Sequence, residues 1–496
     1  MRERVKLPPS KEVIEYLIRP RLESVSLASF ETMMDLNRAH VAMLATKGIM
    51  TQADASKLMR VLQTVLSEGP NSIAWNPELE EAYYNIEAHI ISKAGATVGG
   101  QMHTGRSRND LGAALSRIST RTQVAALAVN LHALREVLLT LAEEHSDTIV
   151  TGYTHMQPAQ PTTLGHYFHA VAQALLRDEV RLQQAYETVN KCPLGACAFN
   201  ATGFDIDRHM LADLTGFSDL AENSIDALAS RDYASQVLST LAILSVTLSR
   251  LAQDLYTWGT DEFGWLELGD DVATTSSIMP QKKNPITLEH IRAKSAHLIG
   301  AVVATLTAQK GTAFGHMRDI SLESTVPLKD GFREAEAIVN LTTATLRSVR
   351  VKEGVAEARA GINFSTVTEL ADVMVREVGL SFREAHIVVG VAVGELTERG
   401  AGPYELDLEL LNRVAQEQLG RRLGLSKESV RRALSPRENV MIRAVTGGPA
   451  PKEVLRSILV SREQLATQEA WWREQALHLE SARHRLNAES DRHAAT

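Results

Sequence analysis

Long proline-free stretches filled with apolar residues at helical spacing are the feature that most limits how this 496-residue chain can fold. The three longest of these stretches are 78–157, 194–279 and 328–402. Apolar residues within 110–145 recur three and four positions apart, which is typical of a helix with a buried stripe and not of a strand. The same period runs through 233–256, 288–306 and 328–349. Because proline breaks helix interiors, the sequence predicts an all-α fold with several helices longer than about 20 residues.

Helices of that length pack side by side in bundles, where facing apolar stripes exclude water along the whole length. Loop-rich sequence ends near Gly105, and shorter segments broken by glycine and proline begin after Glu353. We therefore expect three parts: an N-terminal helical domain (1–105), a central long-helix bundle (106–353) and a C-terminal helical domain (354–496). The polar tail from Ala482 is expected to fray.

The composition restricts the class of partner. The chain has 52 Lys and Arg against 60 Asp and Glu, a formal charge of -8, whereas nucleic acids and anionic membranes select a basic surplus. Two cysteines, Cys192 and Cys197, are too few for a disulfide framework or a four-ligand zinc site, and fit buried thiols in a reducing compartment. No signal-peptide run and no window of about 18 uninterrupted apolar residues is present. We expect a cytoplasmic protein with no nucleic-acid or membrane partner, no metal and no cofactor.

A dense polar cluster lies at 103–110, with the sequence His-Thr-Gly-Arg-Ser-Arg-Asn-Asp, at the start of a long predicted helix. Helix N-termini offer unpaired N–H groups and the positive end of the helix dipole, and arginine adds a planar fork that matches carboxylate or phosphate. One arginine here is usually a solvated cap residue. Two arginines, two hydroxyls and an amide together favour an anion-binding site.

A second polar segment, 274–285, has the sequence Thr-Thr-Ser-Ser-Ile-Met-Pro-Gln-Lys-Lys-Asn-Pro and precedes a helix from about Thr287. Hydroxyls, two lysines and an amide between two prolines are typical of a mobile loop that carries a nucleophile or base together with cations that hold an anion.

Histidines supply the third candidate. His155 lies between two predicted helices with polar neighbours, among them Thr154 and Gln157, although a lone histidine is more often structural than catalytic. His166 and His169, at i and i+3, have no evident third ligand, so packing on a helix face is favoured over metal binding.

At these segments the chain resembles the fumarase/aspartase superfamily, and specifically the argininosuccinate lyase family. The motifs occur in the family's order: HTGRSRND from His103, THMQPAQPTT from Thr154, PLGACA from Pro193, NSIDALASRDY from Asn223 and SSIMPQKKNP from Ser276. The resemblance implies an all-α homotetramer whose long helices form a core of about 20 helices, with each active site shared among subunits. It also implies a β-elimination that splits a carbon–nitrogen bond and releases fumarate.

The resemblance further implies roles for individual residues. Ser276 matches the general base on the mobile loop; since serine is a poor base in water, the site has to activate it, and Lys282 and Asn284 match groups that stabilise the aci-carboxylate left by proton abstraction. His155 and Glu289 match the family's His–carboxylate pair, in which the glutamate fixes one tautomer and favours the charged imidazole. Binding of the substrate carboxylates is assigned to Ser107, Arg108, Asn109, Thr154 and Gln157.

Departures from the family lie on the amine side of the substrate. An ungapped count puts Leu22 and Ser26 where the family has a Ser and an Asp that hold arginine, and Glu81 begins a segment where the family has Asp-Val-His. In a further segment His316 replaces the family's Tyr, and Arg318 precedes the retained Asp319. We therefore expect the elimination chemistry of the family to be retained and the specificity for the leaving amine to differ.

We therefore expect a carbon–nitrogen lyase that acts on an N-substituted aspartate and binds a di- or polycarboxylate substrate. The nearest specific resemblance is to an ethylenediamine-N,N'-disuccinate (EDDS) lyase, with His316 and Arg318 meeting the extra carboxylate. Argininosuccinate lyase itself is the alternative. The family also includes structural lens crystallins, but the retained Ser276, Lys282 and His155 give no sign of a disabled site.

Overall fold

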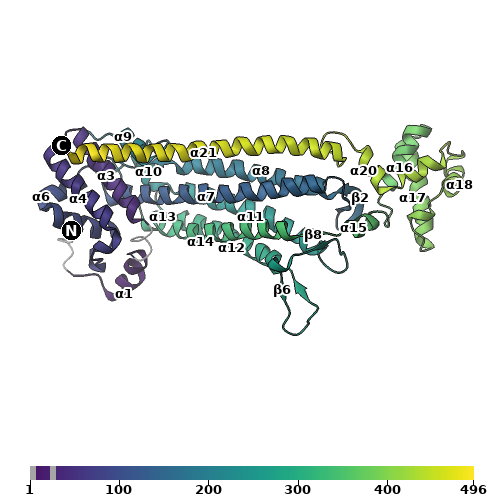
Figure 1. The fold of residues 1–496 in the computed structure, drawn as a ribbon, viewed down its shortest axis with the longest axis horizontal. Helices are drawn as coiled ribbons and strands as arrows, with labels where there is room; N and C mark the ends of the chain where they lie inside the picture. Colours follow the sequence, from purple (N-terminus) through teal and green to yellow (C-terminus); the bar gives the residue numbers. More distant parts are fainter. Residues whose placement is uncertain (1–6, 23–28, 496) are drawn as a thin grey trace.

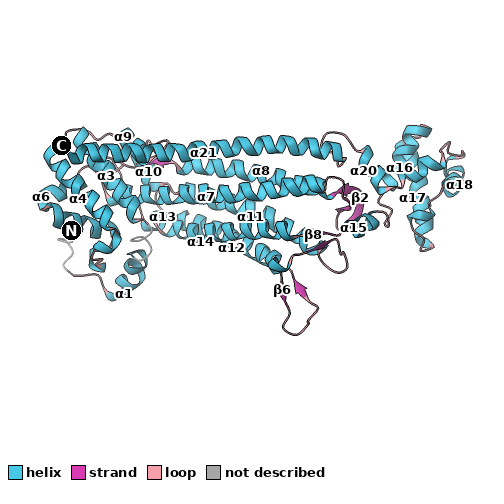
Figure 2. Cartoon of the chain, in the orientation of Figure 1, coloured by secondary structure: helices cyan, strands magenta, loops and turns pink. Residues whose placement is uncertain are grey.

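The computed structural model describes residues 7–22 and 29–495, and Ser26 lies outside these ranges. The fold is all-α, as predicted, with strands confined to short two-stranded sheets (Figure 2). Five long helices lie side by side and form an elongated bundle (Figure 1): α7 (Arg108–Glu144), α8 (Leu164–Val189), α11 (Asp232–Trp258), α12 (Ile286–Gln309) and α14 (Val326–Ser348). Their apolar stripes meet in one core, in which Leu131, Phe168 and Leu241 are fully buried.

The helices at the N-terminal end build a second core around Met34, Leu58 and Ile86. They are α1 (Lys11–Val13), η1 (Ile14–Ile18), α3 (Phe30–Thr46), α4 (Gln52–Glu68), η2 (Pro70–Ser72), η3 (Pro77–Leu79), α5 (Ala82–Ala94), α6 (Ala96–Gly99), η4 (Gly100–His103) and α9 (Arg208–Thr215). Between this core and the bundle lie α10 (Ser224–Ala229), α13 (Arg318–Ser321) and η6 (Glu323–Thr325).

A third core lies at the opposite end of the bundle (Figure 1), around Leu370, Val388 and Leu411. Its elements and their neighbours are α15 (Glu353–Ala360), α16 (Val367–Val373), η7 (Met374–Val378), α17 (Phe382–Glu398), η8 (Pro403–Glu405), α18 (Leu408–Leu419), α19 (Lys427–Ala433) and α20 (Pro436–Ile442).

Helix α21 (Pro451–Ala495) returns along the whole bundle to the N-terminal core (Figure 1). Its Trp472 is part of the bundle core, and its Leu486 is part of the N-terminal core. The prediction that the tail frays from Ala482 is wrong, because Ala482 and Leu486 are buried and Arg38 donates from Nε to Ser490 Oγ at 3.1 Å. Residues 451–495, counted with the C-terminal domain in the sequence-based division, thus pack on the other two parts; the boundaries at 105 and 353 stay a prediction.

Four pairs of short strands complete the fold. The strands β1 (Ile149–Thr154) and β2 (Gln157–Thr163) form an antiparallel hairpin beyond the end of α7. The other pairs are β3 (Lys191–Cys192) with β4 (Asp219–Leu220), β5 (Leu266–Glu267) with β8 (Arg350–Val351), and β6 (Thr274–Thr275) with β7 (Lys283–Asn284); η5 (Asp270–Val272) precedes β6. The β6–β7 hairpin projects away from the bundle (Figure 1).

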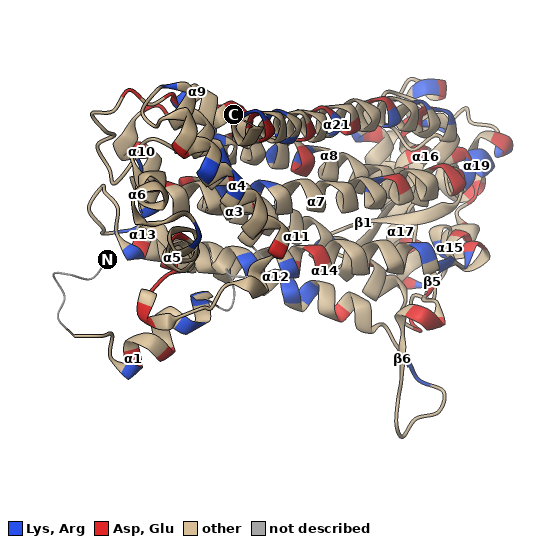
Figure 3. Cartoon of the chain, turned by 60° about the vertical axis from the view of Figure 1, so that its left-hand side comes forward, with Lys and Arg blue, Asp and Glu red and all other residues tan. Residues whose placement is uncertain are grey.

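Two helices, α7 and α11, are long and apolar enough to cross a membrane by length and composition alone. In the structure 44% and 50% of their most apolar windows are buried, and the core helices of a bundle meet the same criterion. Basic and acidic residues are mixed over the helices on the face drawn in Figure 3.

Candidate active site

The largest group of predicted site residues surrounds a cavity of about 300 Å³ between the N-terminal core and the start of the bundle. Arg108 and Asn109 reach it from the first turn of α7, and His316 and Arg318 from the segment that leads into α13. Two stretches separated by about 200 residues of chain therefore contribute to one cavity. Among the described residues, the charged groups in the lining are four arginines and one glutamate: Arg21, Arg108, Arg231, Arg318 and Glu81.

The start of α7 is held by a capping box. Asp110 Oδ1 accepts from the Ser107 N–H at 3.0 Å, and Ser107 Oγ accepts from the Asn109 N–H at 3.3 Å. The other carboxylate oxygen of Asp110 accepts from the N–H groups of Gly195 and Cys197, both at 3.0 Å. Burial raises the pKa of Asp110 to about 6. One buried carboxylate thus joins the HTGRSRND and PLGACA motifs and sets the position of Arg108 and Asn109.

Glu81, the residue before α5, lies between two arginines of the cavity. Its Oε1 accepts from Arg318 Nη2 at 2.6 Å and from Arg108 Nη1 at 3.4 Å. His316 lies beside them, and its Nδ1 is buried with no hydrogen-bond partner among the described residues. Burial and the nearby Arg231 and Arg318 lower the pKa of His316 to about 4, so its imidazole is neutral at neutral pH.

A second group of predicted site residues, Thr154, His155 and Gln157, is exposed at the tip of the β1–β2 hairpin. Thr154 pairs with Gln157, and His155 and Met156 form the turn with φ of 53° and 59°. Such left-handed turns match the twist of a hairpin. The sequence predicts only a connection between helices here; the turn brings all three polar side chains to one exposed tip.

A third group of predicted site residues lies in the β6–β7 hairpin and at the start of α12. Ser276 Oγ accepts from the backbone N–H groups of Ile278 and Met279 at 3.3 and 3.0 Å. Lys282 is exposed in the same hairpin and Asn284 lies in β7. Glu289, in the first turn of α12, accepts from the Tyr256 hydroxyl at 3.5 Å. Within the described part of one chain Glu289 makes no contact with His155, and their pairing stays a prediction.

Within one chain the cavity lies far from both hairpins. Helix α7 has 37 residues between Arg108 and the end that leads to His155, which at about 1.5 Å per residue is a separation of about 55 Å. Helix α11 has 27 residues, about 40 Å, between the cavity at Arg231 and the segment that leads to Ser276. One chain therefore does not bring all predicted catalytic and binding residues together.

The structure places the two remaining histidines and both cysteines at packing positions. His166 hydrogen-bonds Thr162 and the Gly447 carbonyl, and His169 hydrogen-bonds Ser461 at 2.9 Å, as expected for packing positions. Cys192 and Cys197 are buried free thiols, and burial raises both pKa values to about 12. Among residues 7–22 and 29–495, no group of three or more His, Cys, Asp or Glu has a metal-binding arrangement.

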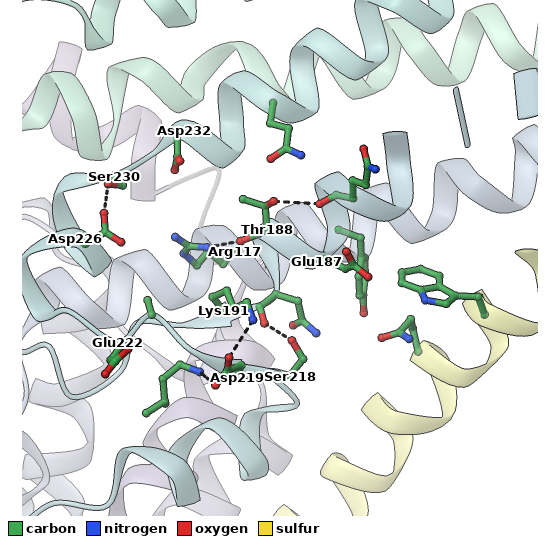
Figure 4. Close-up of a pocket in the computed structure, with 18 residues that line it drawn as sticks. Arg117, Glu187, Thr188, Lys191, Ser218, Asp219, Glu222, Asp226, Ser230 and Asp232 are labelled. Atoms are coloured by element: carbon green, nitrogen blue, oxygen red, sulfur yellow. Dashed lines mark hydrogen bonds and ion pairs between the residues drawn. The ribbon is translucent and has the colours of Figure 1, made fainter. Parts of the chain in front are cut away.

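A larger cavity, about 1010 Å³, lies on the side of the bundle, and none of the predicted site residues lines it (Figure 4). Some of its polar groups pair with one another: Lys191 Nζ lies 3.1 Å from Asp219 Oδ2, and Arg117 Nη1 donates to the Thr188 carbonyl at 2.9 Å. Sequence reasoning missed Arg21 and Arg231 in the smaller cavity. Arg231 belongs to the NSIDALASRDY motif, which could have indicated it as a site residue. No motif includes Arg21.

Comparison with known proteins places the fold in a known family. Residues 26–300 match the family described as Lyase, and residues 364–441 match the family described as Argininosuccinate lyase C-terminal. The protein is a carbon–nitrogen lyase of the fumarase/aspartase superfamily. "Argininosuccinate lyase 1" of Shouchella clausii is 42% identical over 94% of this chain and 93% of its own length. "Argininosuccinate lyase" of Methanothrix thermoacetophila is 39% identical over 97% of both chains. The chain belongs to the argininosuccinate lyase family.

Solved structures support the same placement. EDDS lyase in complex with formate superposes with a TM-score of 0.87 and 32% identity, covering 99% of this chain and 97% of that one. A fumarate lyase from Mesorhizobium sp. BNC1, at 19% identity and a TM-score of 0.70, shares the fold.

Proposed function

We propose that this lyase releases fumarate from an N-substituted aspartate by β-elimination. Ser276 takes a proton from the carbon next to a carboxylate, and the electron pair moves into that carboxylate, where Lys282 and Asn284 stabilise the doubly charged aci form. The pair then returns to form the double bond of fumarate, the carbon–nitrogen bond breaks, and the leaving nitrogen keeps its electrons and takes up a proton. His155 and Glu289 are proposed to act near that nitrogen.

The arginine-rich cavity is the observation that carries this proposal. Arg108 and Asn109 at a helix N-terminus, with Arg318 and neutral His316 opposite, offer forked donors suited to carboxylates. Thr154 and Gln157, like Ser276, lie too far away in the same chain to touch a substrate bound there. We therefore propose that neighbouring subunits supply them, in a homotetramer.

An exposed apolar stripe supports that assembly. Ile299, Val303 and Leu306 of α12 are 49%, 59% and 49% exposed, and their spacing places them on one helix face. Ile243 and Val246 of α11, three positions apart, are similarly exposed. Contiguous apolar faces of this kind mark association surfaces. We also place the protein in the cytoplasm, on the basis of its unpaired buried cysteines.

Two substrates are candidates. The curated relatives carry the name argininosuccinate lyase at 38–42% identity, which makes argininosuccinate the first to test. A specific observation favours an aminopolycarboxylate such as EDDS: a guanidinium needs a carboxylate acceptor, and among the described residues the cavity lining offers one carboxylate, Glu81, against four arginines. Four lining arginines instead suit an anionic far end.

The experiment is an absorbance assay for fumarate with argininosuccinate, EDDS, adenylosuccinate, aspartate and malate, with Ser276→Ala as the blank. Higher kcat/KM for argininosuccinate would assign the chain to arginine formation, and higher kcat/KM for EDDS to aminopolycarboxylate cleavage. Fumarate from none of the N-substituted aspartates would refute the proposed reaction.

A further inference from the structure

Glu81 occupies the position in which two predicted substrate-binding arginines meet. The same oxygen, Oε1, accepts from Arg318 Nη2 at 2.6 Å and from Arg108 Nη1 at 3.4 Å, across sequence separations of 237 and 27 residues. A neighbouring carboxylate, Glu80, lies 3.7 Å from Arg108. The geometry is that of a carboxylate held by two guanidinium groups, which is the geometry expected for a bound substrate carboxylate.

The contact of Glu81 with the two arginines is also exposed enough to solvent for another carboxylate to replace Glu81. The side chains of Glu81, Arg108 and Arg318 are 25%, 34% and 48% exposed, and all three line the cavity. Ion pairs at partly solvated positions contribute little stability, so an incoming carboxylate can replace one without a large cost. By contrast, Asp110, two residues after Arg108, is 1% exposed and held by backbone N–H groups, which makes it a structural carboxylate.

We propose that Glu81 determines specificity as an internal counterion: it holds Arg108 and Arg318 in place until a carboxylate of the substrate replaces it there. This inference rests on the proposed function, in which these arginines bind substrate carboxylates. Glu81 therefore competes with anionic substrates for the two arginines, and it favours substrates whose far end is cationic, because the displaced carboxylate can then accept from that end.

The test compares Glu81→Gln with a matched control, Glu78→Gln. The control removes the same charge three residues away, at an exposed position outside the cavity lining. The probe is succinate, an unreactive dicarboxylate, titrated into the intact protein by calorimetry. Glu81→Gln should bind succinate more tightly by up to about fivefold, the most that a partly exposed ion pair accounts for, and the control should match the parent. Unchanged or weaker succinate binding in Glu81→Gln would overturn the inference.

Kinetics give a second readout that a merely structural role would not move. For EDDS, Glu81→Gln should lower KM with little change in kcat; for argininosuccinate it should raise KM. Equal changes in KM for both substrates would contradict a role in specificity. If Glu81→Gln fails to fold by circular dichroism, Glu81→Asp takes its place, because the shorter side chain weakens the contact with Arg318 and should tighten succinate binding by a smaller factor. Succinate binding needs no turnover, so a chain that releases no fumarate would refute the proposed reaction and still test Glu81.

Discussion

Mixing two inactive variants, Arg108→Gln and Ser276→Ala, is expected to restore lyase activity. Arg108 lines the cavity beside the start of α11, and Ser276 lies beyond the other end of that helix, so its 27 residues separate them by about 40 Å, which a small substrate cannot bridge. An intact site must then take Arg108 from one subunit and Ser276 from another. In randomly mixed tetramers at equal concentrations each site receives either parental residue with even odds, so about a quarter of the sites are intact.

The assay is fumarate release after subunit exchange, for example by mild denaturation and refolding of the mixture. Native mass spectrometry of differently tagged variants measures how far exchange has gone, and each variant refolded alone is the control. Recovery near a quarter of the parental activity is expected. Activity that stays at the level of the single variants, with mixed tetramers present, would refute the reasoning from the helix length and place the whole site in one chain.

Single substitutions at Ser276, Asp110 and His316 test the base, the helix cap and the cavity separately. Ser276→Ala should lower kcat by roughly 10²- to 10⁴-fold with a smaller effect on substrate binding; a kcat near the parental value would remove Ser276 from the mechanism. Asp110→Ala leaves buried N–H donors without an acceptor and should lower the free energy of unfolding by about 3 kcal/mol, measured by urea denaturation, whereas exposed Asp147→Ala should have little effect. His316 should titrate near pH 4 by NMR, below its ordinary value, so the unfolded chain binds more protons and stability should fall as pH drops from about 6.5 to 4; His316→Asn should flatten that dependence, and an unchanged slope would contradict it.

The long helices could be predicted because proline placement and apolar period are local properties of the sequence. The position of α21 could not. The apolar stripe of α21 indicates that one face of the helix is buried, but it does not indicate which other helices cover that face. That depends on tertiary packing, since the contact of Arg38 with Ser490 spans 452 residues. The tail was expected to fray because its composition is polar; the few buried positions, Leu486, Ser490 and His493, are enough to hold it.

The candidate site also has a part that could be predicted from the sequence and a part that could not. Arg108, Asn109, His316 and Arg318 were predicted as substrate ligands from their residue types and from the family resemblance, and the fold brings them to one cavity. The contact of Glu81 with both arginines could not be predicted, since it depends on where the start of α5 lies relative to α13, and no local pattern records that distance. The assignments on the two hairpins stay predictions, because one chain does not bring them to the cavity.

The return of α21 to the N-terminal core has a consequence for biosynthesis. His493 is 1% exposed and hydrogen-bonds Gln52 at 3.1 Å, and the Ser56 hydroxyl donates to the Ala494 carbonyl at 3.2 Å. Helices α3 and α4, which are synthesised within the first 70 residues, therefore cannot pack fully until the last 15 residues of the chain have been made. Contacts of such long sequence separation form slowly. During elongation the faces of α3 and α4 that α21 covers stay open to solvent, which makes them the surfaces that a nascent-chain chaperone would have to shield.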